Sequence, residues 1–169
     1  MPDTLDPALP DDVLDAAEQV LELAHRKDLK LATAESCTGG LLAALLTDVP
    51  GRSHVFERGF VVYSNQAKCD LLGIEPGKVE SCGAVSAPIA RAMALGALRN
   101  SPADVALSIT GFAGPAGPDE EEGLVHFACA RRGDATVERE EHFGPVGRQA
   151  VRVGALKVAL EMLEAALEP

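Results

Sequence analysis

The chain has 169 residues, a length that fits one domain with a single core, and its formal net charge is −11. This charge repels nucleic-acid phosphates and anionic membranes, so we expect neither nucleic acid nor a membrane as a partner. Hydrophobic residues make up 47% of the chain and charged residues 24%, which excludes a disordered protein. The four cysteines and four histidines follow no metal-ligand spacing, so we expect reduced thiols, a cytoplasmic location, and no metal or cofactor.

Residues 1–10 are rich in proline and predict a flexible N-terminal arm, which leaves residues 11–169 as one domain. The stretch "DDVLDAAEQVLELAHRKD", from Asp11, carries apolar residues at helical spacing behind acidic capping residues. Leu29 to Ala34 predict a first strand. Thr38 to Thr47 predict the helix that follows it.

The middle of the chain continues the alternation of strands and helices. "VFERGFVVY" predicts a strand or hairpin that ends at Tyr63, and Ser64 then caps a short helix through Leu72. "VSAPIARAMALGALRN" predicts a helix with Ser86 as its cap and Pro88 in its first turn.

The last third predicts strands that lie side by side. "ADVALSITG" is continuously apolar, which indicates a strand buried on both faces. "GLVHFACARR" and "ATVEREEHF" predict an antiparallel pair, and residues 147–167 predict a long helix. Together the elements predict an α/β fold, a three-layer α/β/α sandwich on a mixed sheet.

Chemically capable residues gather where three predicted strands end. "AESCTGG" follows the first strand, "YSNQAK" the second, and "TGFAGPAG" the buried strand. Ligands of α/β proteins bind at the carboxyl ends of strands, beside helix N-termini. The three motifs therefore predict one binding site.

Ser36 is the first candidate nucleophile. At the start of a helix, the backbone N–H groups of Cys37, Thr38 or Gly39 would hold a developing oxyanion. Gly39 and Gly40 would let a ligand approach the backbone closely. The alternative is a simple helix cap followed by glycines that fit a tight crossing.

Cys37 offers a second nucleophile, because a thiol at a helix N-terminus has a lowered pKa. A thiolate hydrolase needs an imidazole partner, and no histidine falls at any of the three strand ends. We therefore interpret Cys37 as a buried structural thiol.

Lys68 lies one turn into the helix capped by Ser64, on the same face as Asn65. A lysine partly buried near a helix N-terminus loses basicity and can act as a neutral general base for Ser36. Tyr63 would pass the proton or orient the amine. The alternative is that Lys68 is an ordinary surface charge.

The glycine-rich stretch "TGFAGPAGP" lacks the Gly-Lys-Ser/Thr ending of a Walker A loop but can still cradle a phosphate or ribose. Arg148 opens the last helix, with Arg152 one turn further on, and would bind an anionic substrate. A rigid turn and a surface arginine are the alternatives.

In these motifs the sequence resembles the CinA C-terminal domain family, the nicotinamide-nucleotide amidases. "TAESCTGG", "YSNQAK", "GAVS" and "ITGFAGPAG" appear in order, and the match runs from about Val13 to the C-terminus. The resemblance implies a metal-free serine amidase that converts nicotinamide mononucleotide to nicotinate mononucleotide and ammonia, with Ser36, Lys68 and Tyr63 as catalytic residues. The residues predicted to bind the substrate are Glu35, Thr38, Gly39, Gly40, Asn65, Thr110, Gly111, Gly114 and Arg148.

The chain departs from the family pattern "AGPxGG…KPVGTV", since it reads "AGPAGPDEEEGLVHFA" without the Lys-Pro pair, and Arg52 replaces a serine. This departure keeps open a catalytically weakened, nucleotide-binding or regulatory module of the same fold. Small apolar helices with few aromatic residues also leave room for a homo-oligomeric interface.

Overall fold

The computed structural model describes residues 9–168 and contains one five-stranded sheet of order β2-β1-β3-β4-β5. The predicted arm falls mostly outside this range. The strands are β1 (Leu31–Glu35), β2 (Phe56–Val61), β3 (Val105–Gly111), β4 (Leu124–Arg131) and β5 (Val137–His142). β1 pairs in parallel with β2 and β3, whereas β4 pairs antiparallel with β3 and β5. The predicted mixed sheet is confirmed.

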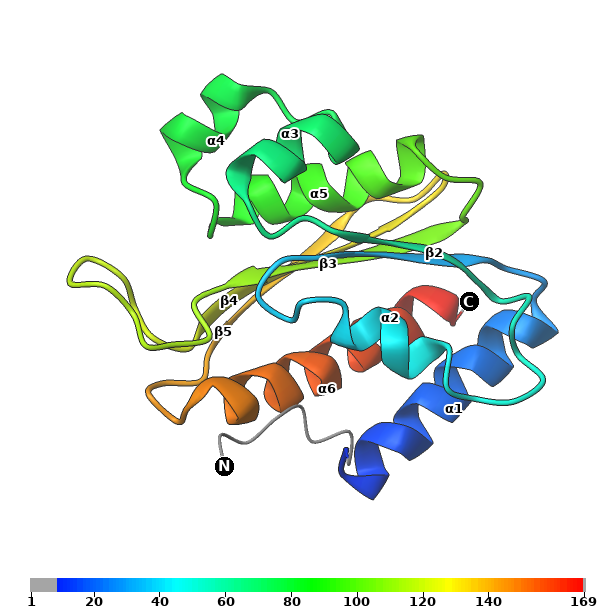
Figure 1. Ribbon diagram of the computed structural model, residues 1–169. Coiled ribbons are helices and arrows are strands. Elements are labelled where there is room, and N and C mark those ends of the chain that lie inside the picture. The colour runs from blue at the N-terminus through cyan, green and yellow to red at the C-terminus, as the bar shows by residue number, and fades with distance from the viewer. Residues whose placement is uncertain (1–8, 169) are drawn as a thin grey trace.

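Helices cover both faces of the sheet, which gives the predicted three layers (Figure 1). One layer holds α3 (Asn65–Leu72), α4 (Pro76–Cys82) and α5 (Ala87–Arg99). The other holds α1 (Asp11–Arg26), α2 (Leu41–Leu46) and α6 (Arg148–Leu167). The connection between β3 and β4 projects beyond the sheet on the side where α6 begins (Figure 1). Within residues 9–168, no helix has both the length and the apolarity of a transmembrane segment.

Small residues bring α5 close to the sheet. The strand residues of this core that are fully or almost fully buried are Ala32, Ala34, Ala106, Ala128 and Ala130. Gly96 of α5 in turn lets α3 approach closely, because a Cβ atom added at Gly96 would lie 2.5 Å from the carbonyl oxygen of Leu72, the last residue of α3. The close packing explains how a chain with 4% aromatic residues builds a dense core.

Two predicted helix caps are present. Ser64 Oγ accepts a hydrogen bond from the Ala67 N–H at 3.0 Å, and Ser86 Oγ accepts one from the Ile89 N–H at 3.4 Å. The first cap fixes where α3 begins and hence where Lys68 lies. α4 was not predicted, because its seven residues bury only Val79 and show no clear periodicity.

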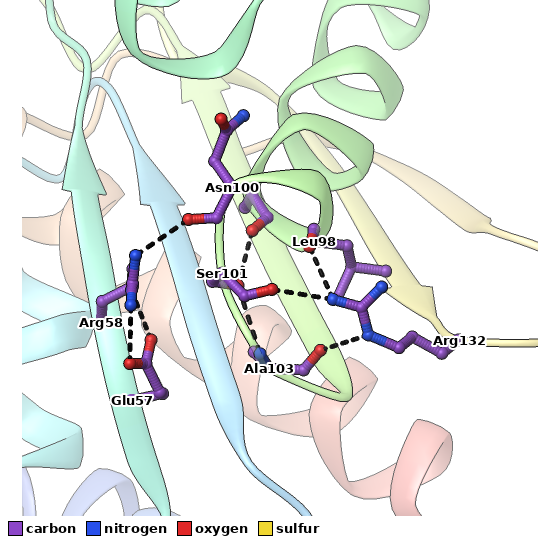
Figure 2. Close-up of polar contacts among 8 residues, drawn as sticks. Glu57, Arg58, Leu98, Asn100, Ser101, Ala103 and Arg132 are labelled. Carbon is purple, nitrogen blue, oxygen red and sulfur yellow. Dashed lines mark hydrogen bonds and ion pairs between the residues drawn. The ribbon is translucent and has the colours of Figure 1, made fainter.

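Two arginines, Arg58 of β2 and Arg132 directly after β4, hold the segment between the end of α5 and the start of β3 (Figure 2). Arg132 donates to the carbonyl oxygens of Leu98, Ser101 and Ala103 at 2.6, 2.8 and 2.8 Å. Arg58 donates to the carbonyl oxygen of Asn100 at 3.0 Å. These bonds satisfy carbonyl groups that the helix end leaves free.

Candidate active site

The carboxyl ends of β1, β2 and β3 meet at one edge of the sheet because the three strands are parallel, as the motifs predicted. A pocket of about 240 Å³ opens there. Its lining residues are Ser36, Cys37, Tyr63, Gly111, Phe112, Ala113, Gly114, Pro115, Glu120 and Arg148. A larger groove of about 720 Å³ lies along α1 and contains none of the predicted site residues. We therefore place the candidate site in the smaller pocket.

Lys68 is buried and reaches the serine. Its side chain, 1% exposed, places Nζ 3.1 Å from Ser36 Oγ. The same nitrogen lies 2.9 Å from the carbonyl oxygen of Val62 and 3.3 Å from that of Tyr63. The alternative of a solvated surface lysine is excluded. The two carbonyl groups fix the amine beside the serine hydroxyl.

Burial lowers the pKa of Lys68 below its usual value, because the charged amine loses its hydration. The Cys37 and Cys69 thiols act in the opposite direction. The lowering matches the expectation for a general base. Its cause is burial.

The expectation that Ser36 stands at a helix start is wrong. α2 begins at Leu41, and Gly39 and Gly40 adopt φ values of +61° and +95°. These left-handed conformations, which glycine adopts at little cost, delay the helix. Ser36 therefore lies in a turn between β1 and α2, and is 7% exposed.

Glu35 caps α2 from inside the fold. Its carboxylate, fully buried, accepts hydrogen bonds from the N–H groups of Leu42 and Ala43 at 2.8 and 3.0 Å. It also accepts one from Thr38 Oγ1 at 2.7 Å. These bonds use up the first amides of α2, so a substrate oxyanion would need other donors. The substrate-binding roles of Glu35 and Thr38 stay predictions.

The turn after β1 has two N–H groups that could donate to an oxyanion, while the others are already bonded. The Ser36 N–H donates to the Ile109 carbonyl at 3.0 Å, and the Gly39 N–H donates to the Ser36 carbonyl at 3.1 Å. Within residues 9–168, the N–H groups of Cys37 and Thr38 make no such bond to a backbone carbonyl. An amide directly after a nucleophile is a common oxyanion donor.

The thiol of Cys37 is buried, as interpreted from the sequence. Cys37 is 4% exposed, and burial raises the pKa of its thiol to about 11. Such a thiol is protonated at neutral pH and is a poor nucleophile. This geometry favours Ser36 over Cys37.

Two arginines of α6 hold the loops around the pocket. Arg148 lines it and donates from Nη2 to the Gly114 carbonyl oxygen at 2.6 Å. Arg152 donates from Nε to the Cys37 carbonyl oxygen at 2.9 Å. The spacing of four residues puts Arg148 and Arg152 on one helix face, but it did not predict the contact with Cys37.

Gly111 and Gly114 line the pocket, but the remaining predicted residues do not. Thr110 is 1% exposed and donates to the Ala84 carbonyl oxygen at 2.8 Å. Asn65 is exposed at the first position of α3. Their roles stay predictions, as do those of Gly39 and Gly40.

A histidine near the site was missed. His126 pairs with Thr110 across β3 and β4, and its Nδ1 is buried without a hydrogen-bond partner among the described residues. The sequence did not predict this contact, because it depends on the register between β3 and β4, which a long connection joins. Within residues 9–168, no group of three His, Cys, Asp or Glu side chains is placed to hold a metal ion.

Comparisons with known proteins agree with this fold. The profile of the CinA C-terminal domain matches residues 14–167. The nicotinamide-nucleotide amidohydrolase PncC of Escherichia coli K12 is 44% identical over 155 residues, which cover 90% of this chain and 93% of that protein. The competence/damage inducible protein CihA of Agrobacterium tumefaciens has a crystal structure with a TM-score of 0.91 at 41% identity. That match covers 95% of this chain and 98% of the other.

Some relatives are longer than this chain. A CinA-like protein of Mycobacterium marinum is 48% identical over 153 residues, which cover 88% of this chain but 36% of that protein. The chain thus spans about a third of the length of such curated relatives.

Proposed function

We propose that this chain, which belongs to the CinA C-terminal domain family, is an amidohydrolase that converts nicotinamide mononucleotide to nicotinate mononucleotide and ammonia. The observation that carries the proposal is the 3.1 Å contact between Lys68 Nζ and Ser36 Oγ, with Ser36 lining the pocket. The amidohydrolase of Escherichia coli, 44% identical over nearly the whole of both chains, supports the choice of substrate.

The chemistry needs Lys68 in its neutral form. The two amine hydrogens would then point to the Val62 and Tyr63 carbonyl groups, and the lone pair would accept the Ser36 proton. Ser36 Oγ attacks the carboxamide carbon as Lys68 takes this proton. The N–H groups of Cys37 and Thr38 hold the oxyanion.

Release of ammonia completes the first half of the reaction. Lys68 donates its new proton to the amide nitrogen, the C–N bond breaks, and a nicotinoyl ester remains on Ser36. Lys68 then takes a proton from water, which attacks the ester and releases the carboxylate. The proton returns to Ser36, so the enzyme ends as it began.

The rest of the pocket would hold the nucleotide. Arg148 would bind the phosphate, and the backbone from Gly111 to Gly114 would lie against the ribose or phosphate. Tyr63, 67% exposed at the rim, would close over the ring or orient the amine. All four cysteines are free thiols, and we extend the proposal to a cytoplasmic location.

One sequence feature favours a second candidate, a module that binds the nucleotide without cleaving it. The loop before β4 lacks the family Lys-Pro pair and carries an acidic run from Asp119 to Glu122. If the chemistry has been lost, the pocket would still bind nucleotide.

Ammonia release from nicotinamide mononucleotide separates these candidates. We expect release by the wild type and by Cys37→Ala, and none by Ser36→Ala. Ser81→Ala, which changes an exposed serine on α4, is the matched control. Binding without release by the wild type would support the second candidate. Loss in Cys37→Ala with activity kept in Ser36→Ala would instead identify a thiol hydrolase.

A further inference from the structure

The pocket carries charges of both signs. Besides Arg148, its lining includes Glu120, which belongs to the loop between β3 and β4. Glu120 lies in a chain whose net charge is already −11, and a carboxylate in this position repels an anionic ligand. A ligand that also carries a positive charge would turn this repulsion into attraction.

The carboxylate of Glu120 is held in place by its own loop. Glu120 Oε2 accepts a hydrogen bond from the Gly117 N–H at 2.8 Å, and the Glu120 N–H donates to the Gly117 carbonyl oxygen at 3.1 Å. The same loop anchors the opposite charge, because Arg148 donates to Gly114. The loop therefore positions both charges before any ligand binds, since it carries Glu120 and anchors Arg148 of α6, and this reduces the ordering cost of binding.

We propose that Glu120 is a specificity-determining residue that selects a positively charged pyridinium ring, while Arg148 takes the phosphate. The inference rests on the proposed function. Oxidised nicotinamide mononucleotide carries a cationic ring and an anionic phosphate, so it matches a pocket with one carboxylate and one guanidinium. The reduced, dihydropyridine form keeps the carboxamide, ribose and phosphate but has a neutral ring.

Of the neighbouring acidic residues, Glu122 packs against Gly114, because a Cβ atom added there would lie 2.3 Å from Glu122 Oε1, but Glu122 does not line the pocket. Asp119 is exposed and does not line the pocket. Glu121 contacts His142 Nδ1 at 2.5 Å, on the side of β5. Asp119→Asn therefore removes one negative charge from the same loop without touching the pocket, and is the matched control.

Binding to three ligands tests the assignment. The Ser36→Ala protein, which should bind the substrate without cleaving it, is titrated with oxidised nicotinamide mononucleotide, its reduced form and ribose 5-phosphate. Adding Glu120→Gln should weaken the oxidised nucleotide roughly three- to fivefold, as for a solvent-exposed ion pair. The reduced form and ribose 5-phosphate should bind equally well or more tightly, since a repulsive charge is gone. Asp119→Asn should change the affinity for all three ligands by the same small factor or not at all.

Glutamine keeps an oxygen that can accept from Gly117, so the loop should survive the change. Equal weakening of all three ligands would overturn the inference, because Glu120 would then only shape the loop. Equal tightening would also overturn it, because Glu120 would only repel phosphate. Ammonia release by the wild type is measured separately. If release fails while the ligand-dependent effect of Glu120→Gln persists, the proposed reaction is wrong and the charge selection stands.

Discussion

Lys68 Nζ lies 3.1 Å from Ser36 Oγ, although the two residues are 32 positions apart and come from different layers of the fold. Lys68 belongs to α3, on the α5 side of the sheet, and Ser36 to the turn after β1. The Lys68 side chain extends from α3 to the carboxyl end of β1 and stays buried along its length. This arrangement gives a lysine that is both buried and aimed at a hydroxyl group.

Lys68→Met should make the fold more stable at neutral pH, because it removes a buried amine whose charged form is poorly hydrated. The pKa of Lys68 is lowered in the folded state, so the unfolded chain binds more protons between that pKa and the usual value of 10.5. Wild-type stability should therefore rise with pH through this window. The Met variant should lack the rise.

Urea unfolding of both proteins from pH 6 to pH 9.5 measures this difference. The buried thiols of Cys37 and Cys129 stabilise the fold below pH 9 and lose that effect above it, since their pKa values are raised to about 11 and about 12. They are present in both proteins, so subtraction removes their contribution. Parallel pH dependences would mean that Lys68 has an unperturbed pKa.

Glu35→Gln should destabilise the fold by about 1–3 kcal/mol, because the carboxylate accepts three hydrogen bonds in a buried place. An amide group would turn one N–H toward these donors. Thermal unfolding checks this. If the melting temperature stays unchanged while KM rises, Glu35 contacts the substrate rather than α2.

Much of the fold could be predicted because each element has its own local signal. Ser64 and Ser86 marked two helix starts, and the apolar run through β3 marked a strand buried on both faces. The turn at Ser36 was mistaken for a helix start because its residues resemble a cap. Only the positive φ angles of Gly39 and Gly40 reveal the difference.

The site could be predicted as a meeting of strand ends but not in its contacts. The burial of Lys68 depends on packing from α3, and the bond from Arg152 to Cys37 joins segments 115 positions apart. His126 reaches Thr110 only through the strand register. Each of these contacts joins residues far apart in the chain, so no local sequence pattern predicts it.

Arg148 and Arg152 should affect different kinetic constants. Arg148→Ala should raise KM by roughly tenfold or more and change kcat little, since a phosphate anchor acts on binding. Arg152→Ala should lower kcat, because the Cys37 carbonyl loses the bond that holds the turn after Ser36. Gln149→Ala, between them on α6, is the control. A KM unchanged in Arg148→Ala would place the phosphate elsewhere.

Arg132→Ala should lower the free energy of unfolding by about 1–3 kcal/mol while kcat stays at its wild-type value. Its three carbonyl partners lie between the end of α5 and the start of β3 (Figure 2). Ser36 follows the carboxyl end of β1, which is parallel to β3, and so lies at the opposite end of the sheet. Urea unfolding and the ammonia assay measure the two effects. A fall in kcat at full stability would show that this end of the sheet communicates with the pocket.

The central claim is that Ser36 and Lys68 act as one catalytic unit, and kcat for ammonia release from nicotinamide mononucleotide tests it most directly. Lys68→Met fits the buried site better than arginine and cannot take a proton. We expect Lys68→Met to lower kcat by roughly 10²–10⁴ and Ser36→Ala to be about as damaging. The double variant should be scarcely worse than either. A Lys68→Met enzyme with near wild-type kcat would contradict the serine–lysine mechanism.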